Sequence, residues 1–360
     1  MSFPYPVKTF SGCMYSPFTR YLLVEQEAQG VMQASKYDPL ITCSGVQSYE
    51  RRYHGHDANG KTICVVRHMG IGDCLVITSV VKYIKDLYPQ ALIDVYTAPH
   101  QSADVWIDNP SLRYARHINS PLTLEAMKQY NYHLFFDGMF EMNTERDQRC
   151  CYDDIFQFCG FYDVPDEKKR PVLYDSAMDS KYVDNSGVDL SKPYYVVVYS
   201  SSNPVRDYPD SKTLDICSIL AKTHNVYLVG AAREKPAIQI DGVINLVNET
   251  RHWRHLIPVI KSAKCVVTPD TGLMHVAACY DVPTVSLWGS FSWASRAKYY
   301  KNNHPLGNHD ICKHSPCWHH GFGCPIKKCK SVNQSVDNKN CWVLDGITPE
   351  EIASKVMEIA

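Results

Sequence analysis

Residues 265–288 read CVVTPDTGLMHVAACYDVPTVSLW, and this stretch predicts the fold of the chain. An apolar run ends in the turn PDTG at 269–272, a helical pattern begins at once, and a second apolar run follows Pro283. This order predicts a strand, a helix and a second strand parallel to the first. The polar turn then lies at the carboxyl end of a strand and in the first turn of a helix, where unpaired amides and the helix dipole attract anions. A diphosphate would fit there, in the crevice where open α/β sheets usually bind their ligands.

The composition describes an ordinary globular protein with no dominant charge. A chain of 360 residues with 45% hydrophobic residues predicts two domains. Lys and Arg number 37 against 38 Asp and Glu, so no overall field favours nucleic acid or an anionic membrane. The first residues lack the pattern of a signal peptide, and no apolar run approaches the ~18 residues of a membrane span. We therefore predict a cytoplasmic protein with no transmembrane segment.

Two successive series of strands and helices follow an N-terminal extension. Residues 61–99 predict a βαβ unit, and a second series begins at Tyr194. These series predict an α/β protein with two doubly wound, Rossmann-like domains facing a cleft. We place the first domain at 61–185 and the second, with a Cys-rich tail segment at 312–341, at 186–360. Residues 1–60 form an extension of unknown role.

The first predicted strand runs into Gly70-Ile71-Gly72-Asp73. Glycines in such a turn let a ligand approach the backbone. Asp73 has two interpretations: a helix N-cap, for which Asp is favoured, or a general base that takes a proton from an attacking hydroxyl. The turn lacks the third glycine of the dinucleotide-binding fingerprint.

Asp270, Thr271, Gly272 and His275 bring a carboxylate, a hydroxyl, backbone amides and an imidazole to one helix terminus. They indicate an anion site, or a capped helix in which His275 satisfies a buried partner.

Two charged residues follow other predicted strands. Arg206 lies in the loop SSNPVRDYP and could neutralise a leaving phosphate, or it could be a solvated surface charge. Glu234 follows the strand NVYLVG and could bind a ribose diol, with the same alternative.

Fifteen cysteines are present, and most lie inside apolar runs as small core residues. Five others cluster in the tail, close to several histidines: Cys312, Cys317, Cys324, Cys329 and Cys341. In a cytoplasmic protein such a cluster favours structural zinc or iron over disulfides. The spacing lacks a CxxC pair, so unligated thiols, or two disulfides in an oxidising compartment, are alternatives.

Two long motifs, ICVVRHMGIGDCLVITSVVKYIKDLYPQALIDVYT and VVTPDTGLMHVAACYDVPTVSLWG, resemble glycosyltransferase family nine, the bacterial heptosyltransferases. The tail motifs CKHSPCWHHGFGCPIKKC and CWVLDGITPEEI are similar to the end of many members. The likeness runs in the same order from residue 61 to the C-terminus and implies a GT-B fold. Some protein-directed relatives share an extra N-terminal segment and a cysteine-bound iron.

The resemblance also implies roles for individual residues. Asp73 matches the catalytic base of the family, and Gly70 and Gly72 form the turn beside it. Other positions match residues that hold the donor diphosphate and nucleoside: Ser200, Ser201, Ser202, Arg206, Glu234, Asp270, Thr271, Gly272 and His275. The resemblance implies that sugar transfer requires no cofactor.

These observations predict an inverting glycosyltransferase. It would move a heptose-like sugar from a nucleotide-diphosphate donor to a hydroxyl on a glycan, a lipopolysaccharide core or a protein. One alternative is transfer to a modified base of DNA, against which the near-neutral charge argues mildly. The other is a non-catalytic protein that binds a nucleotide sugar.

Overall fold

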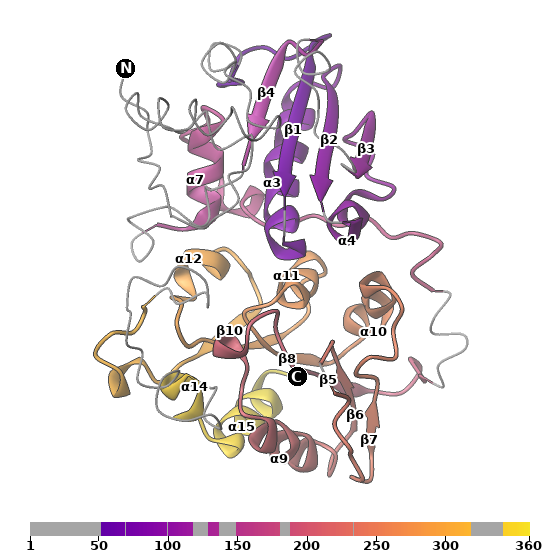
Figure 1. Ribbon diagram of the computed structural model, residues 1–360, viewed down its shortest axis with the longest axis vertical. Helices are drawn as coiled ribbons and strands as arrows, with labels where there is room; N and C mark the ends of the chain where they lie inside the picture. The colour runs from indigo at the N-terminus through magenta and orange to yellow at the C-terminus, as the bar shows by residue number, and fades with distance from the viewer. Residues whose placement is uncertain are drawn as a thin grey trace, which may run out of the picture. The chain divides into compact units, whose positions relative to one another are not determined.

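The computed structural model describes residues 52–68, 70–98, 100–117, 129–136, 149–180, 188–232, 234–317 and 341–360. Most of the N-terminal extension, together with Cys324 and Cys329, lies outside the described residues. The chain divides into two compact units, Met1–Tyr174 and Asp175–Ala360 (Figure 1).

The first unit contains a sheet of four parallel strands in the order β3-β2-β1-β4. Its strands are β1 (Thr62–His68), β2 (Leu92–Ala98), β3 (Tyr114–His117) and β4 (Tyr132–Phe135). Its longer helices are α3 (Ile71–Leu87) and α7 (Cys151–Phe158), and shorter helical turns are α4 (His100–Ala103), η2 (Asp104–Trp106) and η3 (Asp166–Lys168). The predicted βαβ unit is β1, α3 and β2.

Helix α3 covers one face of this sheet because its buried side has no charged residue. Nine of its residues are buried, from Cys74 to Ile84, and the thiol of Cys74 lies 3.6 Å from the hydroxyl of Thr97 on β2. The ring of Tyr83 packs edge-on against Phe156 of α7 at 5.3 Å between ring centres. The helix therefore holds its N-terminal turn firmly at the carboxyl end of β1.

The second unit contains a sheet of six parallel strands in the order β10-β9-β8-β5-β6-β7. Its strands are β5 (Tyr194–Val198), β6 (Asn225–Val229), β7 (Val243–Asn245), β8 (Cys265–Pro269), β9 (Thr284–Leu287) and β10 (Asn303–Leu306). Its α-helices are α9 (Asp210–Leu220), α10 (Ile257–Lys261), α11 (Gly272–Cys279), α12 (Ala294–Ala297), α14 (Trp342–Asp345) and α15 (Pro349–Ile359). Its 3-10 turns are η4 (Pro204–Arg206), η5 (Trp253–Leu256) and η6 (His309–Ile311). Numbered from its own first strand, this is the 3-2-1-4-5-6 order of doubly wound sheets.

Helices cover both faces of the second sheet, which is why its strands read as nearly continuous apolar runs. Alternate residues such as Tyr195 and Val197 face a core that includes side chains of α9 and α15. On the other face, the hydroxyl of Tyr194 donates to the carbonyl of Val259 in α10 at 2.8 Å. Figure 1 shows α9 and α15 side by side, on the opposite side of the strands from α10 and α11.

The boundary between the units lies earlier than residue 186, where the sequence analysis placed it. The segment that follows Tyr174 is bound to the second unit by charged groups. Asp179 accepts two hydrogen bonds from buried Arg254, at 2.7 and 2.8 Å. Asp175 accepts from Lys261 at 2.5 Å and from Tyr280 at 2.7 Å.

Some strands differ from the apolar runs of the sequence. Strand β7 ends at Asn245, although the apolar run INLVN at 244–248 continues beyond it. Strand β10 was not predicted, since its four residues include Pro305; proline is tolerated there because β10 is the edge of the sheet. Of the cysteines inside apolar runs, for which the sequence predicts core positions, Cys64, Cys74, Cys217 and Cys265 are buried, whereas Cys279 is only partly buried. In the described part of the chain, no helix combines the length and the apolar character needed to cross a bilayer.

Candidate functional site

The sheet of the second unit has a switch point between β5 and β8. From β5 the strands continue through β6 to β7 on one side, and from β8 through β9 to β10 on the other. The loops that leave the carboxyl ends of β5 and β8 therefore diverge, and such a point is where doubly wound sheets bind ligands. The loop after β5 carries Ser200 to Arg206, and the turn after β8 carries Asp270 and Thr271.

Arg206 joins these two loops. One terminal nitrogen of its guanidinium, Nη1, donates to the main-chain oxygen of Asp270 at 3.1 Å and lies 3.3 Å from its Oδ2. The other, Nη2, donates to the hydroxyl of Ser202 at 2.6 Å. The side chain of Arg206 is 20% exposed and that of Asp270 is 7% exposed. Arg206 is therefore a positioned cation at the switch point, and the interpretation as a solvated surface charge does not describe it.

Asp270 lies in a cationic environment. Burial alone would raise the pKa of its carboxyl, but the charges of Arg206 and Arg296, together with His275, outweigh burial and hold that pKa below its usual value. Arg296 belongs to α12, follows the carboxyl end of β9, and is 9% exposed. Arg296 was not identified from the sequence. The signal that could have found it is its place after β9, the strand next to β8.

Helix α11 begins beside Arg206 with an uncapped N-terminus. Its N-cap residue, Thr271, is extended and makes no capping hydrogen bond; the Thr271 hydroxyl lies 3.2 Å from that of Thr268. The first turn contains no acidic side chain, so the helix dipole and the leading amides keep their attraction for an anion.

His275 lies in the second turn of α11 and is 3% exposed. Its Nδ1 atom is hydrogen-bonded to the hydroxyl of Tyr300, and the two rings meet edge to face at 5.7 Å and 84°. The interpretation of His275 as a residue with a buried partner is therefore correct for this nitrogen. Tyr300 was not identified from the sequence.

The three serines after β5 are part of a hydrogen-bonded loop. Ser200 donates to the carbonyl of Ala231, Ser201 donates to that of Asn203 at 2.7 Å, and Ser202 accepts from Arg206. The amide of Ser201 donates to the carboxylate of Asp207, whose pKa burial raises despite this hydrogen bond and the nearby Arg206.

Glu234 follows β6 and is exposed, and within the described residues no hydrogen bond joins it to Arg206 or Asp270. The loop before it is held by Asn248, whose side-chain amide accepts from the amide of Ala232 at 2.9 Å and donates to its carbonyl at 2.8 Å. The structure thus gathers Ser202, Arg206 and Asp270, with α11 beginning next to them.

In the first unit, Asp73 lies in the first turn of α3 at the carboxyl end of β1. The N-cap of this helix is Gly70, with φ +76°, so Asp73 is not the capping residue. Gly72 is the second residue of the helix. The Oδ2 atom of Asp73 accepts from Nη2 of Arg67 at 2.5 Å, and the side chain of Asp73 is 22% exposed. Arg67 was also missed in the sequence analysis.

The cysteines of the tail are only partly described. Cys341 is buried, Cys312 and Cys317 are partly buried, and Cys324 and Cys329 lie outside the described residues. Cys341 and Cys312 pack in the apolar core of the second unit. Within the described ranges, no three His, Cys, Asp or Glu side chains come together as metal ligands.

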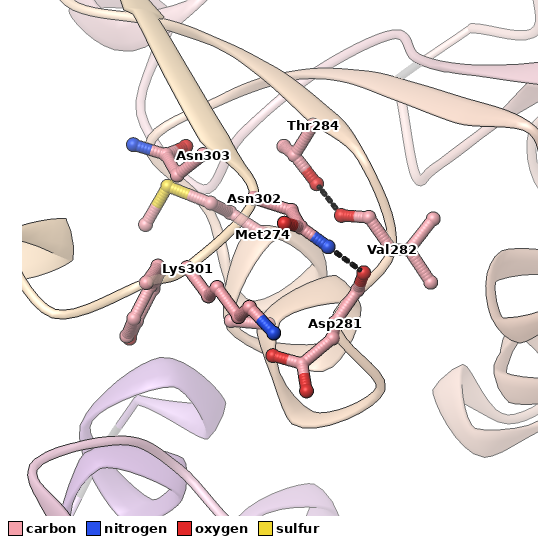
Figure 2. Close-up of a pocket in the computed structure, with 9 residues that line it drawn as sticks. Met274, Asp281, Val282, Thr284, Lys301, Asn302 and Asn303 are labelled. Atoms are coloured by element: carbon pink, nitrogen blue, oxygen red, sulfur yellow. Dashed lines mark hydrogen bonds between the residues drawn. The ribbon is translucent and has the colours of Figure 1, made fainter. Parts of the chain in front are cut away.

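A small open hollow lies against α11, where Figure 2 shows Met274, Lys301 and Asn303 around it. It adjoins the first residues of β9 and β10, Thr284 and Asn303. These are the amino ends of parallel strands, so the hollow is distinct from the switch-point crevice at their carboxyl ends.

A doubly wound sheet with a partly buried arginine and an uncapped helix at its switch point is typical of proteins that bind nucleotides or related phosphates. Residues 131–322 match the family model of glycosyltransferase family 9 (heptosyltransferase), which is more than half of the 360 residues. The chain therefore belongs to glycosyltransferase family 9 and is a glycosyltransferase, as the resemblance implied. No curated protein sequence matches the chain.

Solved structures support the fold. The ADP-heptose lipopolysaccharide heptosyltransferase II of E. coli is 17% identical, with a TM-score of 0.58 over 83% of this chain and 98% of that one. A family 9 glycosyltransferase from Veillonella parvula is 13% identical, with a TM-score of 0.57 over 84% and 99%. The iron-containing dodecameric glycosyltransferase TibC of enterotoxigenic E. coli is 12% identical, with a TM-score of 0.58 over 86% and 77%. TibC has also been solved in complex with ADP-D-β-D-heptose. At these identities the likeness establishes the GT-B fold alone, and it confirms the predicted fold class.

Proposed function

We propose that this glycosyltransferase transfers a heptose-like sugar, with inversion, from a nucleoside-diphosphate donor to an acceptor hydroxyl. The acceptor would belong to a glycan, a lipopolysaccharide core or a protein. The observation that carries the proposal is the contact of Arg206 with Asp270 across the switch point, at the start of α11. A fixed cation and unpaired helix amides form a site for a diphosphate.

The donor diphosphate would lie against the amides that follow Thr271, within reach of Arg206. Arg296 is a buried cation near Asp270, so two arginines act on this carboxylate. The hydroxyls of Ser200, Ser201 and Ser202 stand in the same loop and would accompany the phosphates. The complex of TibC with ADP-D-β-D-heptose supports an ADP-linked sugar as the first donor to test.

The proposed reaction is a single displacement. Asp73 accepts the proton of the acceptor hydroxyl, and the oxygen attacks the anomeric carbon on the face opposite the diphosphate. The bond from that carbon to the phosphate oxygen breaks, and its electron pair leaves with the diphosphate. Arg206 and the N-terminus of α11 stabilise the charge of the leaving group, so the phosphates need no metal ion.

A donor screen tests the binding half of the proposal. Thermal shifts are measured with ADP-, GDP-, UDP- and CDP-sugars, because a ligand of the native state raises apparent stability. We expect ADP-heptose to raise the midpoint for the natural chain and to lose most of its effect with Arg206→Met. Equal shifts for both proteins would remove Arg206 from the donor site, and no shift with any nucleotide sugar would contradict the proposal.

A transfer assay tests the catalytic half. The rate of ADP release from ADP-heptose, or of the corresponding diphosphate from the donor that the screen selects, is followed with a glycan extract as acceptor. Asp73→Ala should keep the thermal shift and lose the release. Normal turnover by that variant would exclude Asp73 as the base. Labelled sugar that binds and is never consumed would favour the non-catalytic alternative.

The predicted zinc or iron would bind the cysteines of the tail segment 312–341 as a structural metal, and it would take part in no step of sugar transfer. Metal analysis of the purified protein, with Cys324→Ser and Cys329→Ser compared with the buried core variant Cys217→Ser, tests it. Zinc or iron that is lost only from the tail variants would support a structural metal, as the iron of TibC suggests.

A further inference from the structure

Arg67 is a buried arginine at the carboxyl end of β1, with its side chain only 2% exposed. We infer that Arg67 is the positioning residue of Asp73: it holds one carboxylate oxygen in place and so directs the carboxylate toward the acceptor hydroxyl. This inference rests on the proposed role of Asp73 as the base. Arg67 itself touches neither the sugar nor the acceptor.

The guanidinium of Arg67 is fixed at two points. Its Nη1 atom donates to the carbonyl of Phe136, immediately after β4, at 3.0 Å, and its Nη2 atom donates to Oδ2 of Asp73 at 2.5 Å. Because the guanidinium is planar and rigid, fixing one nitrogen on a backbone carbonyl also fixes the direction in which the other nitrogen points. Arg67 thereby fixes the position of the Asp73 carboxylate relative to the backbone of the sheet.

These contacts lie at the switch point of the first unit. In the order β3-β2-β1-β4 the chain extends from β1 to β2 and β3 on one side, while β4 lies on the other. Arg67 bridges the carboxyl ends of β1 and β4 in the same way that Arg206 bridges those of β5 and β8. The two units thus each place one arginine between the diverging loops.

Gly70 leaves the space that the carboxylate occupies. A Cβ atom on this residue would lie 2.5 Å from Oδ2 of Asp73, which is closer than real contacts allow, and 3.1 Å from its Cγ, which is tight. Its φ of +76° is also a conformation that glycine adopts at little cost. Arg67 on one side and the bare Cα of Gly70 on the other therefore allow one orientation of the carboxylate.

The chemistry of arginine suits this task. A guanidinium stays protonated at all working pH values, so it cannot take the proton that Asp73 must accept. Lysine would keep the charge, but a single ammonium on a flexible stem would not hold both the carbonyl of Phe136 and Oδ2 in one geometry. The positioning function consequently depends on the two terminal nitrogens of the arginine side chain.

The test compares Arg67→Lys and Arg67→Gln with the natural chain in the ADP-release assay. Misplacing a catalytic group by about 1 Å can lower a rate by roughly 100-fold, so we expect both variants to lose roughly 10- to 100-fold in rate at saturating donor. The donor KM and the thermal shift with ADP-heptose should stay as in the natural chain, because the donor residues lie in the second unit. Arg113→Lys is the matched control, since Arg113 makes a forked contact with buried Asp94 on β2, away from the carboxyl edge.

Chemical rescue provides a readout that a merely structural role would not produce. Guanidinium ion at non-denaturing concentration should restore part of the rate of Arg67→Ala and none of the rate of Asp73→Ala, at a temperature where circular dichroism shows both variants folded. If Arg67→Ala does not fold, the Lys and Gln variants decide the question. A natural rate in Arg67→Lys, or an equal loss in Arg113→Lys, would overturn the inference. Normal turnover by Asp73→Ala would instead remove the proposed function, so the two failures are distinguishable.

Discussion

The guanidinium of Arg206 contacts both the main-chain oxygen and the carboxylate of Asp270, although Arg206 and Asp270 are 64 positions apart in the chain. The contact closes the carboxyl edge of the sheet between β5 and β8. It also explains how a buried carboxylate is tolerated beside the uncapped N-terminus of α11, because the cation compensates the charge of Asp270.

Replacing Arg206 by Met should weaken donor binding. A hydrogen bond to a charged group contributes about 1.5–3 kcal/mol, so the donor KM should rise roughly 10- to 100-fold. The rate at saturating donor should fall as well, because the leaving diphosphate loses a cation. Lys212→Met is the control: this lysine pairs with Asp345 at the surface of the same unit. A similar rise in KM for both variants would contradict a specific role.

Tyr300→Phe should loosen His275 without unfolding the protein. The Tyr300 hydroxyl is the hydrogen-bond partner of Nδ1 of His275. Losing this hydrogen bond, which contributes about 1 kcal/mol to holding the imidazole in place, should lower donor affinity roughly fivefold. Titration calorimetry with ADP measures this change. Tyr280→Phe makes the same substitution after the other end of α11, where the hydroxyl contacts Asp175, and should leave ADP affinity unchanged.

Two aspartates of the second unit, Asp207 and Asp270, should affect the free energy of unfolding in opposite directions. Burial raises the pKa of Asp207 in the folded state, so its ionisation costs stability as pH rises above the unfolded value of about 3.9. Asp207→Asn should therefore be more stable than the natural chain at pH 7, and this gain should shrink near pH 4.

For Asp270, burial is outweighed by Arg206, Arg296 and His275, and the folded pKa is lowered. Its stabilising contribution is present above about pH 3.9 and is lost as pH falls through the folded pKa. Asp270→Asn should destabilise the protein at pH 7. Urea unfolding of both variants at the two pH values measures the signs, and equal signs would show that the charge environments are wrongly assigned.

The segment after Tyr174 should depend on one ion pair far more than on the other. Asp179→Ala leaves Arg254, which is fully buried, without its carboxylate and should cost about 3–5 kcal/mol of unfolding free energy. Lys261→Ala removes an ammonium that is 44% exposed and should cost about 1 kcal/mol or less. Urea titration compares the two, and similar losses would mean that burial does not decide the difference.

Much of the fold could be predicted from local pattern. The apolar runs of β1, β5 and β8, and the glycine turns that follow β1 and β8, are local signals, and the structure places these elements where they were expected. The four-residue strand β10 escaped prediction because so short an edge strand with a proline carries no periodic signal.

The candidate site could be predicted only in part, for a reason of distance along the chain. Thr271 and His275 follow from the helix start, and Asp73 from the glycine turn. Tyr300 and Arg296 come from segments with no motif of their own. Tyr300 reaches His275, and Arg296 comes near Asp270, only because β9 pairs with β8.

The sequence by itself determined that this protein is built of parallel α/β units and that polar residues stand at the ends of particular strands. Hydrophobic period and Gly or Pro punctuation act over a few residues, so they can be read locally. Only the tertiary structure decided that β8 pairs with β5, so that Arg206 reaches Asp270, and that β4 pairs with β1, so that Arg67 reaches Phe136. Strand order results from packing among distant segments, and no local pattern contains it.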